Sequence, residues 1–305
     1  MDYAAFREKI RPIFGDIKNE DSISFQLFDL TDLFQKISAI YSFASAQTET
    51  SFQNPIIFQV VHSALVYGVC VQIRRLADGS QHNEISLYKL VSEIRSNYRG
   101  WNRQSFVTWD GQPYDPAELR RQHHAETDRL LSERLQNGTS AAWIPIGKHE
   151  EIERRHFVFD LLSAKSKDAK RSPSDLWGPQ FAKYLTKLLS EGSADVTDFA
   201  NKYLAHRIHF APERKPEFSV PLEKIESAIC SLWKCFNVLN SIFHDSYTTP
   251  EIIHQYDSFQ KLGLPLVRPD HEERFVRGYE IIKSRMDEDV GQFARVWERQ
   301  FVSQQ

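Results

Sequence analysis

The chain has 305 residues, enough for one large or two modest domains, and its 41% hydrophobic and 26% charged residues are typical of a globular protein. Its formal net charge of -3 argues against a uniformly basic nucleic-acid-binding protein but leaves room for a local basic patch. The three cysteines, Cys70, Cys230 and Cys235, are too few for a disulfide framework, and no apolar run is long enough to span a bilayer. We therefore expect a cytoplasmic protein with no membrane partner.

Helical periodicity dominates the first third of the chain. One core helix is predicted over residues 28–48. A second is predicted over 54–77, with Asn54 as its cap and Pro55 in its first turn. The second helix is apolar nearly all round, so we expect it to be central and buried. A shorter amphipathic helix follows over 86–98, capped by the serine at its start.

Residues 98–175 weaken this pattern and are predicted to be an insertion. Glycine and proline breakers around "DGQP" predict a loop over 98–117. A polar helix is predicted over 116–138, followed over 139–175 by one more charged helical piece among polar residues.

Strong helical order returns in the last third. Helices are predicted over 175–192 and 193–210, with Gly192 as the break between them, then over 220–244 and about 272–302. The predicted fold is an all-α helical bundle, with 28–48, 54–77, 193–210 and 220–244 as its core helices. The apolar surface of 54–77 and 220–244 exceeds what one bundle seam needs, which predicts a homodimer.

The stretch "DFANKYLAHRIHF", residues 198–210, gathers the side chains best suited to chemistry. On a helical wheel Phe199 and Ala200 share an apolar arc with Val196, Tyr203 and Phe210. His206 lies at the edge of that arc, and Lys202 and His209 flank it on the polar side. Arg207 falls inside the arc, where a guanidinium needs a partner or a cleft.

Two segments resemble the AbiU-like, abortive-infection branch of the HEPN superfamily. They are "ALVYGVCVQIRRLADGSQHNEISLYKLVSEI" and "ANKYLAHRIHF", and the resemblance covers residues 25–97 and 176–246. It implies a HEPN-like bundle over 1–250, with 98–175 as the insertion and 251–305 as a C-terminal helical extension. It also implies homodimers and metal-independent endoribonuclease activity, with RNA as the partner.

The family hallmark is an arginine and a later histidine with four to six residues between them. If His206 is that histidine, the chain departs from the hallmark, because Phe199, Ala200 and Asn201 hold the arginine positions. The resemblance implies His206 as the acid or base and Arg207 or Lys202 as the phosphate-holding cation. Candidate substrate-binding residues are Asn201, His209, Arg74, Arg75 and Asp78.

Four of these residues have a structural alternative. His206 can be a half-buried boundary histidine that bonds a neighbouring helix. Arg74 and Arg75 suit a helix C-terminus, and Asp78 suits the turn before Gly79. The alternative function is a non-catalytic helical scaffold that binds an unidentified protein partner and has lost the arginine–histidine chemistry.

The remaining histidines give weaker signals. His123 and His124 lie on a polar helix without partner ligands at metal spacing, so we expect a solvated face. His149 and His156 are seven residues apart, but their charged neighbours favour exposure. We expect neither a metal nor a cofactor.

Overall fold

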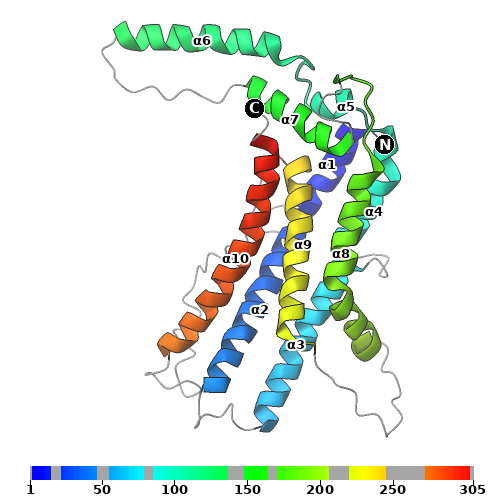
Figure 1. The fold of residues 1–305 in the computed structure, drawn as a ribbon, viewed down its shortest axis with the longest axis vertical. Coiled ribbons are helices and arrows are strands. Elements are labelled where there is room, and N and C mark those ends of the chain that lie inside the picture. Colours follow the sequence, from blue (N-terminus) through cyan, green and yellow to red (C-terminus); the bar gives the residue numbers. More distant parts are fainter. Residues whose placement is uncertain are drawn as a thin grey trace. The chain divides into compact units, whose positions relative to one another are not determined.

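The computed structural model describes residues 2–14, 22–46, 55–78, 85–136, 148–163, 170–205, 220–244 and 272–302. All regular elements in these ranges are helices, which confirms the all-α prediction (Figure 1). They are α1 (Tyr3–Phe14), α2 (Ile23–Ala46), α3 (Pro55–Ala77), α4 (Leu87–Asn97), the 3-10 helix η2 (Tyr98–Gly100), α5 (Arg103–Val107), α6 (Pro116–Gln136), α7 (Lys148–Ser163), α8 (Pro179–Phe199), the π-helix η3 (Ala200–Ala205), α9 (Leu222–Phe243) and α10 (Glu272–Val302).

Most predicted helices are found within a few residues of their expected bounds. Those at 54–77, 116–138, 220–244 and 272–302 correspond to α3, α6, α9 and α10. α2 begins five residues earlier than predicted, because the Ser22 hydroxyl accepts a hydrogen bond from the Phe25 amide at 3.1 Å and so caps the helix.

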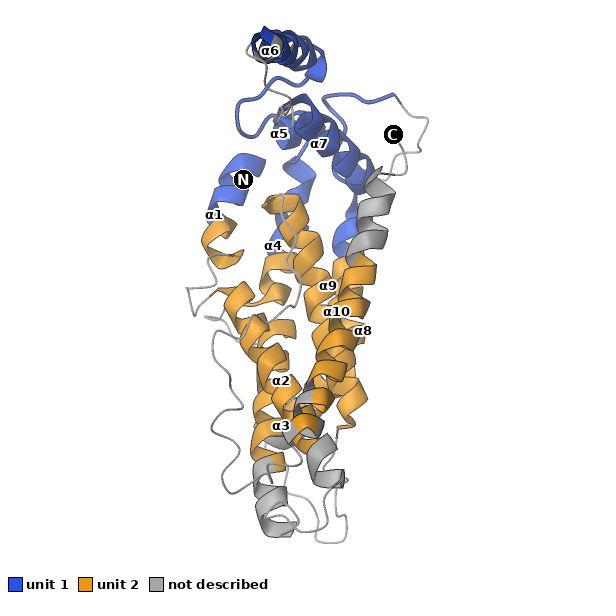
Figure 2. Cartoon of the chain, turned by 90° about the vertical axis from the view of Figure 1, so that its left-hand side faces the viewer, with its two compact units in different colours: residues 1–9, 93–182, 300–305 blue, residues 10–92, 183–299 orange. Residues whose placement is uncertain are grey.

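The chain divides into two compact units (Figure 2). Unit 1 comprises residues 1–9, 93–182 and 300–305, and unit 2 comprises 10–92 and 183–299.

An aromatic cluster forms the core of unit 1. Trp101 stacks obliquely on Trp177, with ring centroids 5.0 Å apart, and meets Tyr3 edge-on at 5.6 Å. Phe106 joins the cluster and contacts Phe159 on α7 at 5.4 Å. Large rings bury much apolar area per residue, so this small unit obtains a core from few side chains.

The predicted loop over 98–117 is wrong in its first half, where the structure has η2 and α5. Asn102 and Ser105 form a reciprocal capping box, in which each side chain accepts a hydrogen bond from the other residue's backbone amide. The box and the burial of Phe106 stabilise a helix too short to show periodicity. The turn that follows does match the prediction, with Gly111 at a φ of 81°.

α9 is the central helix of unit 2. Every residue from 228 to 243 is buried except Lys234. Trp233 is fully buried, meets Phe28 of α2 edge-on and donates a 2.8 Å hydrogen bond from Nε1 to Thr31 Oγ1. On its other sides α9 forms ion pairs with α8, through Lys224 and Asp195, and with α10, through Lys234 and Asp289.

The prediction that 54–77 is the central buried helix is therefore wrong, because α9 takes that place. Val71 of α3 is 46% exposed, and Ala64 and Arg75 are exposed on the same side. Small apolar side chains are tolerated at the surface, while the polar residues of α9 are satisfied inside the core; Ser241, for example, donates to the Val238 carbonyl. The apolar surface of α9 is used within one chain, so it is not available for a dimer.

Gly192 does not separate two helices as predicted but lies inside the continuous helix α8. A Cβ atom at this position would collide with the Ser231 side chain of α9. Glycine is therefore required here by the close approach of α8 to α9, and not by a turn.

Gly192→Ala is expected to lower the free energy of unfolding by about 1–3 kcal/mol, because overpacking outweighs the gain in helix propensity. Gly291→Ala on α10 is the matched control, since nothing lies within 4 Å of its added Cβ. It should stabilise the protein by about 0.4–1 kcal/mol. Urea denaturation followed by circular dichroism measures both. A Gly192→Ala variant as stable as Gly291→Ala would show that the two helices do not touch at Ser231.

Candidate functional site

The predicted site begins where α8 changes its winding. Val196, Phe199 and Ala200 are buried, so the apolar arc of the wheel is confirmed for these three residues. From Ala200 to Ala205 the chain forms the π-helix η3, in which each turn holds about one more residue than in an α-helix. The helical-wheel positions predicted at 100° per residue therefore do not apply from Ala200 to Ala205. His206, Arg207 and His209 lie outside the described residues.

η3 presents two of the predicted site residues. Asn201 is half-buried and Lys202 is exposed. The Lys202 Nζ lies 3.6 Å from Asp198 Oδ2, one turn earlier, and the two side chains are 58% and 70% exposed. Such an exposed pair is worth little in free energy, so Lys202 can exchange the carboxylate for another anion at low cost.

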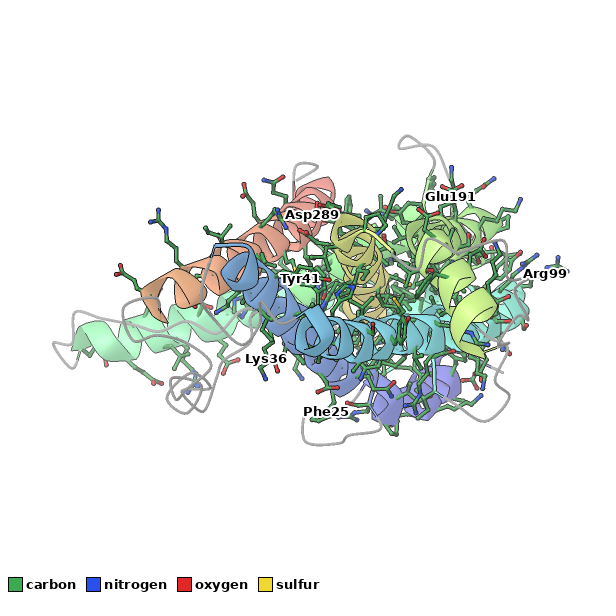
Figure 3. The ribbon with its side chains drawn as sticks, turned by 90° about the horizontal axis from the view of Figure 1, so that it is seen from below. Phe25, Lys36, Tyr41, Arg99, Glu191 and Asp289 are labelled. Atoms are coloured by element: carbon green, nitrogen blue, oxygen red, sulfur yellow. The ribbon has the colours of Figure 1, made fainter. Side chains whose placement is uncertain are left out.

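α8 carries a second ion pair of the same kind. The Lys187 Nζ lies 3.7 Å from Glu191 Oε2, again at i,i+4 spacing, and both side chains are more than two-thirds exposed. Glu191 is labelled on this helix in Figure 3. The two pairs differ in their place along the chain, since only Lys202 belongs to the π-helical segment.

α3 packs against η3, and Tyr67 meets Phe199 with ring centroids 6.1 Å apart. α3 and α8 run in opposite directions (Figure 1). Arg74 follows Tyr67 by seven residues, about 10 Å along α3 at about 1.5 Å per residue. Lys202 follows Phe199 by three residues, so the two cations lie on opposite sides of this ring contact.

The predicted residues of α3 accordingly form a separate group. Arg74 and Arg75 occupy the last turn of the helix, and Arg74 Nε lies 3.9 Å from Asp78 Oδ2. This is the arrangement that the helix-end alternative predicts. The structure does not bring Arg74, Arg75 or Asp78 beside Asn201 and Lys202.

Sequence reasoning missed a hydrogen-bonded histidine–tyrosine pair at the α2–α3 contact. The Nε2 atom of His62 lies 2.9 Å from the hydroxyl oxygen of Tyr41, which is labelled in Figure 3. Burial lowers the pKa of His62, which favours a neutral imidazole at this contact. The signal was present in the sequence, because His62 lies on the same face as the buried residues Val66 and Val69.

Two histidines predicted to be exposed are buried instead. His149 is 8% exposed and His156 is 4% exposed. His156 Nε2 lies 2.8 Å from the Tyr114 carbonyl oxygen, to which it can donate. Burial lowers the pKa of His156, and the hydrogen bond to the carbonyl opposes this. Their charged sequence neighbours were misleading, because Arg155 is itself buried and bonded to Asp110.

The ionisable groups of the described residues show no metal-site geometry. Within those ranges no group of three or more histidine, cysteine, aspartate or glutamate side chains is arranged to hold a metal ion. Cys70, Cys230 and Cys235 are all buried and free. None of the described helices is both long and apolar enough to cross a membrane.

Comparison of the chain with protein-family models, with curated proteins and with solved structures found no match. The resemblance to the AbiU-like HEPN branch therefore rests on the two sequence segments quoted above.

Proposed function

We propose that this protein is an AbiU-like HEPN bundle of a defence system that binds single-stranded RNA at η3 and cleaves it without a metal ion. The observation that carries the proposal is the π-helical winding of Ala200–Ala205, immediately before the "HRIHF" motif. π-Helical turns are rare and occur frequently at functional sites, because they redirect side chains at a cost in backbone regularity.

The proposed chemistry assigns one role to each side chain. His206 takes the proton from the RNA 2′-hydroxyl, whose oxygen then bonds to the adjacent phosphorus. The bond from phosphorus to the 5′-oxygen breaks, and the leaving oxygen takes a proton from water. His206 then returns the proton it took to the solvent. The products are a 2′,3′-cyclic phosphate and a free 5′-hydroxyl. Lys202 and Arg207 hold the phosphate as its charge grows, and Asn201 and His209 supply hydrogen bonds.

The assembly and location belong to the same proposal. The resemblance implies a homodimer, and α3 offers exposed apolar surface at Val71, whereas α9 offers none. Light scattering is expected to give twice the 35.6 kDa mass of one chain. A mass equal to one chain would remove the dimer from the proposal. Three free thiols and no disulfide suit a reducing, cytoplasmic setting.

Lys202→Ala is expected to weaken binding of single-stranded RNA and to reduce the slope of log K against log salt by about 0.7, the value for one phosphate contact. Lys187→Ala is the matched control, because it breaks a nearly identical ion pair on α8. It should leave both affinity and slope unchanged. Fluorescence anisotropy across a salt series measures the two quantities. Equal effects of the two substitutions would mean that RNA binds, if at all, through general electrostatics and not at η3.

A specific observation favours the non-catalytic alternative. The position five residues before His206, where the family has an arginine, is Asn201. An amide cannot replace a guanidinium at a developing phosphate charge. If the protein binds RNA or a protein partner through η3 and does not cut RNA, His206→Ala should cause no loss of cleavage activity.

A further inference from the structure

Three histidines from two helices meet at the contact between α6 and α7 in unit 1. The ring of His149, at the start of α7, lies 5.2 Å from the ring of His123 and 6.3 Å from the ring of His124, measured between centroids. The two α6 rings are 6.3 Å apart. The side chain of His149 is covered, whereas His124 is exposed.

Charged groups of both signs surround this histidine cluster. Arg120 of α6 faces His149 together with His123 and His124, and Glu150 of α7 is the acidic group beside it. Arg120 is held at the interface by an ion pair with Glu153 of α7. Protonation of His149 would therefore place positive charge beside Arg120 and the two other imidazoles, and Glu150 would offset only part of it.

α6 has little apolar burial to hold it in place. No described side chain of α6 is fully buried. Its inward positions are only half-buried, namely Pro116, Leu119, His123, Thr127 and Leu130. A helix attached through polar and half-buried contacts opens at low free energy, so a modest change in charge can release it.

The residues just before α6 are held by a contact that does not depend on pH in the same way. His156 bonds the Tyr114 carbonyl and packs edge-on against the Tyr114 ring, with centroids 4.7 Å apart. A protonated imidazole still donates from Nε2, so this contact survives acidification. The chain just before α6 can thus stay fixed while the helix moves.

What the three side chains of the cluster have in common is an imidazole that can take up a proton. Described residues contain no metal-ready group of three ligands, and histidine is the side chain whose charge changes near neutral pH. We propose that α6 is a pH-sensitive arm that lies on α7 at neutral pH and detaches when the covered His149 takes up a proton beside the rings of His123 and His124.

The direction of the pH effect follows from linkage. Burial lowers the pKa of His149 below its ordinary value of 6.5; the nearby His123, Arg120 and His124 act in the same direction, and Glu150 opposes them. His149 therefore binds a proton less tightly when α6 is docked on α7 than when α6 is detached. Docking is fully stable above the ordinary histidine pKa and is lost as the pH falls through the lowered value, by up to about tenfold per pH unit for each proton taken up.

The test measures the distance between α6 and α7 in the full chain. Spin labels on Ser132→Cys and Leu161→Cys report it, because both positions are exposed. The native thiols compete little: burial raises the pKa of Cys70 and Cys230 to about 12 and the pKa of Cys235 further still. Double electron–electron resonance should give one short distance at about pH 7.5 and a longer, broader distribution at about pH 5.5.

Two further variants, made in the same labelled chain, separate the cluster from other acid effects. His149→Leu should keep the short distance at the lower pH, since it removes the covered imidazole. His123→Lys should release α6 already at neutral pH, since it places a permanent charge in the cluster. Circular dichroism confirms that each variant is folded. A wild-type distance unchanged by pH, or a His149→Leu variant that opens like the wild type, overturns the proposal.

Discussion

Arg103→Met is expected to destabilise unit 1 by about 3–5 kcal/mol, since it removes one partner from a buried ionic network. Arg103 is fully buried on α5. Its Nε donates to Asp175 at 3.0 Å, its Nη2 lies 2.6 Å from Asp160, and its Nη1 donates to the His156 carbonyl at 3.0 Å. The substitution leaves Asp175 buried with an uncompensated charge, and this is the main cost.

Arg171→Met is the matched control. Arg171 donates twice to the same Asp160 carboxylate, but its side chain is 45% exposed. Its loss should cost less than about 1 kcal/mol, as for surface ion pairs in general. Urea denaturation followed by tryptophan fluorescence compares the two variants, with Trp101 and Trp177 reporting on unit 1. An Arg103→Met variant no less stable than Arg171→Met would mean that the network is hydrated and not buried.

His206→Ala is expected to lower the rate of RNA cleavage by about 10² to 10⁴, the usual effect of losing one acid–base group, with little change in RNA affinity. The reason is that His206 moves a proton, whereas Lys202 and Arg207 hold the phosphate. Lys187→Ala, on the same helix, should retain the wild-type rate. Single-turnover cleavage of an end-labelled RNA, read on a denaturing gel, gives these rates.

A structural role for His206 predicts a different pattern. Its replacement would then lower the melting temperature by an amount that corresponds to roughly 1–3 kcal/mol and would leave any cleavage unchanged. Measuring the melting temperature beside the cleavage rate distinguishes the two roles, because a folded but inactive variant fits only the catalytic one.

The long helices could be predicted because their periodicity repeats over many turns. The identity of the central helix could not. α9 contains polar residues such as Asn237 and Asn240, which indicate a solvated face in a sequence but are buried here in the core of unit 2. Gly192 was misleading for a related reason, because a glycine required by a close helix contact looks the same in a sequence as a glycine that ends a helix. Both features depend on the partner helix.

The candidate site could be predicted only in part. The buried arc of Val196, Phe199 and Ala200 followed from spacing. The π-helical winding did not, since the hydrogen-bond pattern of a single turn leaves no periodic signal. The separation of Arg74 from Lys202 depends on the antiparallel packing of α3 and α8, which sequence spacing within either helix does not contain.

The measurement that bears most directly on RNA cleavage by this protein is a time course with single-stranded RNA, low salt and a metal chelator. Wild-type protein is expected to bind the RNA and cut it in the chelator, leaving 2′,3′-cyclic phosphate ends that are absent with His206→Ala. Wild-type protein that neither binds nor cuts single-stranded RNA across a range of pH around neutrality would contradict the ribonuclease proposal and favour a helical interaction protein.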